Sequence, residues 1–419
     1  MDFQALTCHI WCIMPARKKP ASASSCDVLI IGAGPAGLCM ARALAPSGLK
    51  IILVERAPLQ SIAAPQADGR DIALTHLSRH LMDELGLWKS IDRKEINPLR
   101  EARVVNGTSP YFLRFHQPSA PDESLGFLIA NHVIRKAAYD SLKGFKNIHL
   151  LADTSVKSVR TTPQRGEVTL QTGKKLTAKL IVAADSRFSA SRAQMGIEIE
   201  RKEFGRTVIV GRVKHSKPHG GIAWECFIDE QTLAVLPLHG KTSSFVITLP
   251  DAVAEEVMHM PDREFGKFLT SRFQNRVGKM EIMGTRHPYP LVGVYAKTFH
   301  GLRYALVGDA AVGMHPVTAH GFNFGLRGGY DLARRITAAF GNGEDIGNDK
   351  LLGAYTRQHR RVTRPLYLST NALVALYTSK TPVAQVARKG LLHLGNALRP
   401  INKLLMSRLT ELPAARKRA

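Results

Sequence analysis

Three glycines close to the N-terminus have the spacing of a phosphate-binding turn. They are Gly32, Gly34 and Gly37 in the sequence GAGPAG. A short β-branched run at residues 28–31 precedes them, and apolar residues at helical spacing follow from Pro35. In such a turn the first glycine bends the chain, the second admits a pyrophosphate, and the third lets helix and strand pack closely. The N-terminus of the helix adds N–H groups and a positive dipole for the phosphates.

An acidic residue stands where the next strand should end. Glu55 closes the apolar run 51–54, 18 residues after Gly37, and Arg56 follows it. A carboxylate at this position can accept hydrogen bonds from ribose hydroxyls. Strand, glycine turn, helix and strand form one βαβ unit of a parallel sheet. The pattern indicates a site for a dinucleotide, either FAD or NAD(P), unless the glycines only form a tight turn.

Two further apolar strands each lead to an aspartate. One reads IVAADSRFSASR and ends at Asp185, and the other reads YALVGDAA and ends at Gly308 and Asp309. A carboxylate at the carboxyl end of a parallel strand lies where nucleotides bind in such sheets. Either aspartate could instead cap the helix that follows it.

The strands that would position these residues are not contiguous in the sequence. They occur at 26–55, 148–184 and 304–307, whereas residues 206–250 alternate like an antiparallel sheet. We therefore expect an α/β (mixed α+β) fold, in which a Rossmann-like domain carries an inserted antiparallel-sheet domain and a C-terminal helical region. The expected division is 1–25 as a disordered or over-extended N-terminus, 26–105, 126–202 and 297–345 as the nucleotide-binding domain, 106–125 and 203–296 as the substrate domain, and 346–419 as a basic helical region.

The composition excludes several classes of protein. With 419 residues, 44% of them hydrophobic, the chain can build a large core, which excludes a mini-protein, a collagen and a fully disordered tail. It has no run of about 18 apolar residues, so we expect no membrane-spanning helix. The five cysteines are scattered, which predicts a reducing compartment without disulfides. The 16 histidines show no metal-ligand spacing, and we predict no metal.

The net charge of +24 is concentrated near the C-terminus. Residues 351–419 carry 13 Lys and Arg against one acid, Glu411. Stretches at 386–392 and 401–406 interleave basic and apolar residues at helical spacing, which suits a helix on an anionic membrane. A solvated helix that packs on the domain is the alternative, and no motif for nucleic acid accompanies the charge. At the other end, either Met1 or Met14 could be the initiator.

From Cys26 to about Tyr355 the chain resembles the FAD-dependent aromatic hydroxylases with the para-hydroxybenzoate hydroxylase fold. GAGPAG resembles their ADP-binding turn, and AADSRFSASR resembles their DGxxSxxR segment, which faces FAD and is linked to the use of NAD(P)H. RYALVGDAA resembles the segment whose aspartate, here Asp309, holds a ribityl hydroxyl. The arginine of DGRDIAL, here Arg70, would reach the flavin phosphates or ribityl chain.

Within that fold the chain is similar to the ring hydroxylases of ubiquinone biosynthesis. DGRDIALT, AWECFIDEQTLAVLPL and HPVTAHGFNFGLRGG resemble segments of that family in wording and order. The resemblance implies a monooxygenase that hydroxylates a polyprenylated phenol through a C4a-hydroperoxyflavin, most like the branch acting on 5-demethoxyubiquinol. Oxygen would be the second substrate, and NADPH, NADH or a partner reductase the electron donor. It also implies a cytoplasmic protein, peripheral at the inner face of the membrane, in a possible ubiquinone-biosynthesis complex.

The motifs and the resemblance together give three groups of site residues. The cofactor-binding candidates are Gly32, Gly34, Pro35, Ala36, Gly37, Glu55, Arg56, Arg70, Asn131, Asp185, Gly308 and Asp309. The loop beside the flavin ring would contain Pro316, His320, Gly321, Phe322 and Asn323. The inserted sheet would roof the substrate, with Trp224, Phe227 and Pro237 as pocket candidates, although each could simply pack in the core. No side chain is expected to attack the substrate, because the flavin carries the chemistry.

Four positions depart from the family pattern. Ser186 replaces a glycine of the DG segment, His320 replaces a glutamine, His132 replaces an arginine, and Gly328 replaces an aspartate. These departures keep other functions open. The chain could be another flavoenzyme of the same fold, either a polyprenyl reductase or an epoxidase. It could also be a non-catalytic subunit of a biosynthetic complex.

Overall fold

A computed structural model describes residues 24–107, 109, 111–116, 124–228, 231–315, 320–378, 381 and 411. The predicted N-terminal extension, apart from Ser24 and Ser25, lies outside the described residues, and so does the choice of initiator. The same holds for Pro316 and for the amphipathic stretches at 386–392 and 401–406.

The glycine turn belongs to a sheet with a parallel centre. Strand β1 pairs in parallel with β2 and β11, β11 pairs in parallel with β18, and β2 with β8. The order is β17 (His300–Gly301), β18 (Tyr304–Leu306), β11 (Lys175–Ala183), β1 (Ser24–Ile31), β2 (Ile51–Val54) and β8 (Ile148–Leu151). An antiparallel extension joins β11 through β10 (Gly166–Leu170) and β9 (Val156–Thr161). The β1 residues at 28–31 are almost fully buried, as their β-branched and apolar side chains favour.

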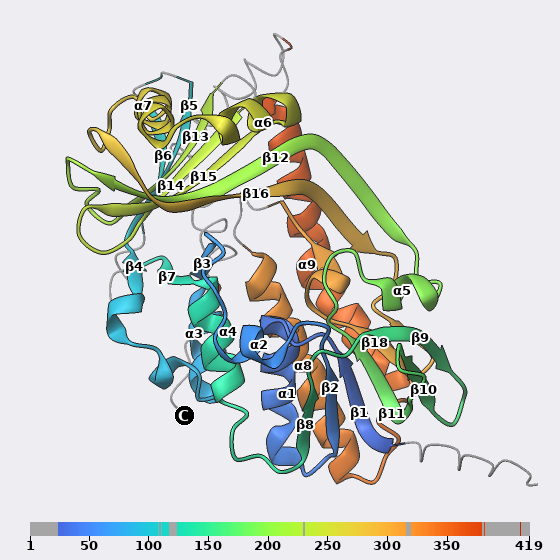
Figure 1. Cartoon of the computed structure of the whole chain (residues 1–419). Helices are drawn as coiled ribbons and strands as arrows, with labels where there is room; N and C mark the ends of the chain where they lie inside the picture. The colour runs from blue at the N-terminus through green and yellow to red at the C-terminus, as the bar shows by residue number, and fades with distance from the viewer. Residues whose placement is uncertain are drawn as a thin grey trace, which may run out of the picture.

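Helices cover this sheet in the lower half of Figure 1. Helix α1 packs against α4 and α8, and α8 also packs against α9. The longer helices are α1 (Pro35–Leu44), α3 (His76–Glu84), α4 (Asn131–Asp140), α8 (Gly321–Gly341) and α9 (Asp349–Thr378). Short helices are α2 (Leu59–Ala63) and α5 (Ala190–Gln194), with 3₁₀ turns at η1 (Ala45–Ser47), η2 (Trp88–Ser90), η3 (Arg93–Glu95) and η5 (Gly308–Ala310). None of the described helices has both the length and the apolar character needed to span a bilayer.

A second sheet lies across the top of the molecule in Figure 1. Its pairings are antiparallel except for that of β13 with β5. The order is β19 (Val312–Gly313), β16 (Met280–Ala296), β12 (Ile199–His215), β15 (Thr242–Pro250), β14 (Gln231–Pro237), β13 (Ile222–Ile228), β5 (Glu101–Asn106) and β6 (Phe112–His116). Helices α6 (Asp251–His259) and α7 (Asp262–Arg272) bury one face of it in a separate apolar cluster. The two sheets confirm the predicted mixed α/β fold.

A small sheet that the sequence did not reveal lies between the other two. It has the order β3 (Asp71–Leu74), β7 (Gly126–Ala130), β4 (Asn97–Leu99), and β4 packs against β14 of the large sheet. Two polar contacts join its first strand and the preceding loop to the sheet above. Arg212 donates to both carboxylate oxygens of Asp71, at 2.6 and 3.2 Å, and the Tyr289 hydroxyl donates to the Asp68 carbonyl at 2.8 Å.

We predict that Asp71→Asn loosens the two sheets. The Asp71 side chain is 1% exposed and Arg212 is 38% exposed, so the change removes a charged acceptor from the buried end of the contact. A hydrogen bond to a charged group contributes about 2 kcal/mol, and we expect a loss of that size in urea unfolding of the FAD-loaded protein. The control is Asp262→Asn, because Asp262 is 64% exposed in its ion pair with Arg286. We expect that control to cost roughly 0.5 kcal/mol, and equal losses in the two variants would contradict the prediction.

Candidate functional site

The glycine turn shows two different uses of glycine. Gly32 has φ +105°, and a Cβ there would lie 2.4 Å from the Ala184 carbonyl oxygen. A Cβ on Gly37 would lie 2.0 Å from the Gly32 oxygen. These two positions exclude any side chain because backbone packs against backbone. At Gly34, by contrast, a Cβ would meet nothing within 4 Å. This open space at the second glycine is where the motif places a pyrophosphate.

The start of helix α1 leaves its N–H groups available. Gly34 is the N-cap residue, and no side chain caps the helix. Pro35 occupies the first turn, where the missing N–H costs nothing. Four N–H groups at a helix start lack partners within the helix, and together with the dipole they favour an anion. The beginning of α1 therefore fits the phosphates of a dinucleotide.

Glu55 braces the glycine turn from the end of β2. One carboxylate oxygen accepts from the Ala33 N–H at 2.7 Å, and the other accepts from the Ala57 N–H at 2.9 Å. A carboxylate has about four acceptor positions, so room remains for ribose hydroxyls. Arg56, the next residue, is exposed.

The ends of three neighbouring strands meet at this turn. Strands β1, β11 and β18 are in register, with Ile31 beside Ala183 and Ala183 beside Leu306. Gly308 has φ +61°, and a Cβ there would lie 2.9 Å from the Ala36 side chain. A Cβ on Gly325 would lie 3.2 Å from the Gly308 Cα. The glycine turn, the Gly308 turn and the start of α8 therefore converge, as the sequence predicted.

Asp185 and Asp309 differ in how many hydrogen bonds their carboxylates accept within the protein. One oxygen of Asp185 accepts from the Ser191 N–H at 3.2 Å and from its hydroxyl at 2.8 Å, which supports the start of α5. The other oxygen is buried and has no partner among the described residues. Asp309 accepts from Arg187 at 3.3 Å and is 36% exposed, so its carboxylate can reach a ligand. Sequence reasoning missed Arg187, although it stands inside the DSRFSASR segment.

Arg70 and Asn131 meet through Asp68. The Arg70 guanidinium donates to the Asp68 carboxylate, and the Asn131 amide donates to the same oxygen at 2.7 Å. Burial alone would raise the pKa of Asp68, but the hydrogen bonds from Arg70 and Asn131 hold it below its usual value. The Arg70 guanidinium also lies over the Tyr289 ring, at 5.4 Å. The cluster holds the Arg70 guanidinium beside β3, paired with the ionised Asp68.

The start of helix α8 also lacks a side-chain cap. Its N-cap residue is His320, which is buried and packs on Phe324 with ring centroids 5.4 Å apart. A Cβ on Gly321 would lie 3.9 Å from an Asp309 carboxylate oxygen, and Phe322 is half-buried. Asn323 ties the helix to β3, since its amide donates to the Ala73 carbonyl at 2.8 Å and accepts from the Thr75 N–H at 3.1 Å.

One departure from the family pattern, at Gly328, has a structural reason. A Cβ on Gly328 would lie 2.7 Å from the His359 ring, so no aspartate fits there. The neighbouring Arg327 instead pairs with Glu411, at 2.6 Å. The Glu411 carboxylate also accepts from the Thr75 hydroxyl at 3.1 Å. The single acid of the basic tail is thus bound beside α3 and α8.

The three pocket candidates do not come together. Trp224 faces helix α7, and its ring packs edge-on against Phe273 with centroids 6.1 Å apart. Phe227, three positions along β13, is buried on the opposite face of the sheet. Pro237 lines a hollow of about 280 Å³ together with Asn97 and His219. We therefore leave Trp224 out of the proposed pocket.

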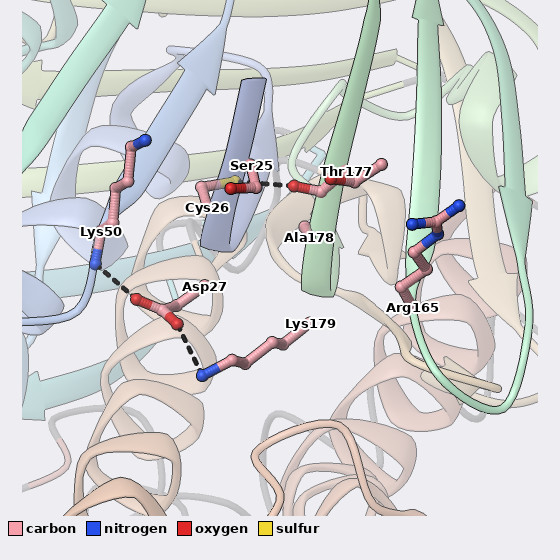
Figure 2. Close-up of a pocket in the computed structure, with 8 residues that line it drawn as sticks. All are labelled: Ser25, Cys26, Asp27, Lys50, Arg165, Thr177, Ala178 and Lys179. Atoms are coloured by element: carbon pink, nitrogen blue, oxygen red, sulfur yellow. Dashed lines mark hydrogen bonds and ion pairs between the residues drawn. The ribbon is translucent and has the colours of Figure 1, made fainter. Parts of the chain in front are cut away.

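Another hollow, of about 260 Å³, lies away from these residues (Figure 2). It is lined by Ser25, Cys26, Asp27, Lys50, Arg165, Thr177, Ala178 and Lys179. Asp27 accepts from the Lys50 N–H and pairs with Lys179. The hollow lies at the amino ends of β1 and β11, whereas the glycine turn follows the carboxyl end of β1. It therefore takes no part in the site. Among the described residues no group of His, Cys, Asp and Glu could hold a metal ion.

Comparisons with known proteins agree with this arrangement. A family described as FAD binding domain matches residues 25–367. The chain is 45% identical to the ubiquinone hydroxylase UbiM of Neisseria meningitidis, over 92% of this chain and 84% of that protein. It is 34% identical to the ubiquinone hydroxylase UbiL of Rhodospirillum rubrum, over 90% of this chain and 88% of that protein. The crystal structure of p-nitrophenol 4-monooxygenase PnpA from Pseudomonas putida has a TM-score of 0.73 at 17% identity, covering 94% and 100% of the two chains.

We predict that Gly34→Ala and Gly37→Ala fail in different ways. The Gly34 variant should fold with unchanged stability, because its Cβ enters open space. It should bind FAD at least about tenfold more weakly, since the methyl group takes the place of a phosphate oxygen. The Gly37 variant should lose stability, because its Cβ meets the Gly32 backbone. Thermal unfolding without cofactor and FAD titration measure the two effects, and full FAD affinity in the Gly34 variant would contradict the assignment.

We further predict that Ser186→Gly stabilises the protein. Ser186 has φ +78°, a left-handed conformation that costs a residue with a side chain about 1–2 kcal/mol. Glycine removes that cost but loses more chain entropy, which leaves a net gain of roughly 0.5–1 kcal/mol. Ser189→Ala is the matched control in the same loop, because the Ser189 hydroxyl accepts from the Arg192 N–H at 3.0 Å and caps α5. It should lose about 1 kcal/mol. A lower melting temperature for the glycine variant would refute the prediction.

Proposed function

This chain belongs to the family of FAD-dependent hydroxylases of ubiquinone biosynthesis, and from that premise we propose that it hydroxylates 5-demethoxyubiquinol. The observation that carries the FAD part of the proposal is the meeting of three strand ends with the uncapped start of α1, where the space at Gly34 is open. The 45% identity to a ubiquinone hydroxylase supports a polyprenylated ring as the substrate class. The choice of ring position is part of the proposal.

We propose the residues around Gly34 as the FAD site. The start of α1 would hold the pyrophosphate and Glu55 the adenosine ribose, while Arg70 and Asp309 would hold the phosphates and the ribityl chain. The observed groups fit these roles, because an open glycine, uncapped N–H groups and a carboxylate with free acceptor positions are what this cofactor needs. When bound, FAD supplies the redox chemistry and the activation of oxygen. Asp185 and Asn131 complete the set as supporting residues.

The start of helix α8 has an electrostatic role in this proposal. Its N–H groups carry partial positive charge, and no side chain caps them. They would favour negative charge on a flavin ring bound at His320, Gly321 and Phe322. Burial lowers the pKa of the nearby His315 to about 4, helped by the charge of Arg187, so its imidazole is neutral at pH 7. It therefore adds no positive charge of its own beside the helix start. Pro316 is proposed for the same loop.

The underside of the large sheet would keep water from the reacting ring. Val208, Val210 and Leu291 are buried there, with Phe204, Val246 and Tyr289 packed against them. Phe227 is buried on the same face of the sheet, at β13. Exclusion of water protects reactive intermediates from hydrolysis, so the surface suits oxygen transfer. We propose Phe227 and Pro237 as pocket residues.

The electron donor, the cellular location and the domain division also belong to the proposal. The sequence holds no second GxGxxG, so NADPH or NADH would dock transiently, or a partner reductase would supply electrons. We propose a cytoplasmic location, at the membrane that holds the polyprenyl substrate and in contact with other enzymes of its synthesis. We also propose the division into FAD-binding segments at 26–105, 126–202 and 297–345 around an inserted substrate domain, except that β5 goes with the substrate domain because it pairs with β13 and β6.

The test is a turnover with isotopically labelled dioxygen. The FAD-loaded protein is reduced anaerobically with NADPH, NADH or dithionite in the presence of a short-tailed 5-demethoxyubiquinol, and oxygen is then admitted. We expect a product heavier by one labelled oxygen atom, because a monooxygenase inserts one atom of O₂ into the ring. Failure with both nicotinamides and success with dithionite would point to a partner reductase. Bound FAD with no labelled product after chemical reduction would refute the proposal, and a reduced prenyl chain or an epoxide would assign one of the alternatives.

A further inference from the structure

Glu225 lies on the face of the large sheet that is turned toward β3, β7 and β4. Its neighbours along the strand, Trp224 and Cys226, face the other way, where Cys226 is buried in the apolar cluster with helices α6 and α7. Side chains alternate along a strand, so Glu225 and Phe227 share the opposite face. Figure 1 shows α6 and α7 above the sheet and the three short strands below it. Glu225 is therefore on the side of the proposed FAD site.

Apolar side chains flank Glu225 on both neighbouring strands. The register pairs Glu225 with Val104 on β5 and with Ala234 on β14, and Ala234 in turn pairs with Val246. Val246 pairs with Val210 on β12. Val210 pairs with His287 on β16, and a Cβ on Gly69 would lie 2.6 Å from the His287 ring and 3.0 Å from the Val210 side chain. The row of residues that starts at Glu225 is therefore apolar as far as Val210 and reaches the Arg70 segment at His287.

Glu225 has no hydrogen bond or ion pair within the described part of the chain. Glu101, on the neighbouring strand β5, provides the contrast, since it pairs with Arg103 and Arg114. Glu225 lies deep in the protein, yet part of its surface stays accessible, so it borders a space rather than packed atoms. A deep carboxylate without a partner is costly for the fold. A ligand that donates a hydrogen bond would offset that cost.

The surroundings raise the pKa of Glu225 to about 8, and the cause is burial. The residues that share its face on the adjacent strands are uncharged, as are those of β4 below: Ala102, Val104, Asn106, Thr232, Ala234, Leu236, Asn97, Pro98 and Leu99. The adjacent Cys226 thiol is neutral, because burial raises its pKa to about 12. A carboxyl group that titrates near the working pH is suited to proton transfer.

We propose that Glu225 is the catalytic base that accepts the proton of the substrate's ring hydroxyl. This inference rests on the proposed function, since it assumes a phenolic substrate under the sheet. The O–H bond of the phenol breaks, its electron pair stays on the phenol oxygen, and a new O–H bond forms on the carboxylate. The resulting phenolate is richer in electrons at the ring carbon that accepts oxygen. The carboxylic acid returns its proton to water when the product leaves.

The decisive variant is Glu225→Gln, which keeps the shape of the side chain and removes the proton acceptor. The control is Glu281→Gln, because Glu281 is an exposed glutamate of β16 in the same sheet. Both FAD-loaded proteins are reduced with dithionite and mixed with oxygen and the short-tailed quinol, and hydroxylation is followed in a single turnover. We expect at least about a hundredfold slower hydroxylation in the Glu225 variant at pH 7, the size of a general-base effect, and no change in the control.

The dependence on pH separates a base from a structural role. Because the base must be ionised, hydroxylation by the native protein should rise with pH through about 8. The Gln variant should lose this rise and recover only as the phenol itself ionises. Glu225→Asp keeps a carboxylate at a different depth, so its rise should remain with a displaced midpoint. An unchanged rate in Glu225→Gln, or an unchanged midpoint in Glu225→Asp, would overturn the proposal, and the Asp variant decides if the Gln variant does not retain FAD.

A binding experiment distinguishes failure of this inference from failure of the proposed function. The probe is 4-nitrophenol, which is ionised above neutral pH and absorbs visible light in that form, titrated into the oxidised holoenzyme at several pH values from neutral upward. Protonated Glu225 can donate to the bound phenolate, whereas ionised Glu225 repels it, so affinity for the native protein should fall as the pH rises through about 8 and affinity for Glu225→Gln should not. A fall confined to the native protein, without hydroxylation of the quinol, would leave Glu225 standing and refute the proposed function. Hydroxylation of the quinol by native protein and Glu225→Gln alike would do the reverse.

Discussion

The whole site depends on the contact of backbone with backbone at the glycine turn. Gly32 lies so close to Ala184, and Gly37 so close to Gly32, that no side chain fits between them. This contact sets the height of helix α1 above β1 and β11. Gly308 and Gly325 repeat the arrangement one strand further, where η5 and α8 approach Ala36. Small residues at these four positions bring two helix starts and three strand ends within reach of one ligand.

The large sheet is held above this centre by polar contacts as well as by the ends of β12, β16 and β19, which join the apolar cluster around the parallel sheet. Its own apolar cluster with α6 and α7 is separate from the cluster around the parallel sheet. The Asp71–Arg212 pair and the Tyr289–Asp68 hydrogen bond fix the sheet relative to β3 and the loop before it. Asn323 fixes helix α8 to the same strand from below. Strand β3 and the loop before it therefore contact both the large sheet and helix α8.

Local patterns in the sequence predicted the glycine turn, its acid and the alternating sheet at 206–250. Each of these depends on neighbours within a few residues. The pattern did not reveal the β3–β7–β4 sheet, the pairing of Arg187 with Asp309, or the bond of Glu411 to Arg327, which join residues far apart in the chain. Trp224 was chosen for its ring, although strand alternation could have separated it from Phe227. The same alternation points to Glu225, which sequence reasoning overlooked.

The order of strands in the parallel sheet has a consequence for biosynthesis. Strand β1 starts at Ser24, its partner β11 ends at Ala183, and β18 follows only at Tyr304. The large sheet is also closed late, because β5 pairs with β13 across more than a hundred residues of chain. A ribosome that adds about 5–20 residues per second needs many seconds to deliver all of these partners. The nascent polypeptide therefore carries unpaired apolar strands for that time, and the three strand ends of the proposed FAD site can meet only after β18 has been made.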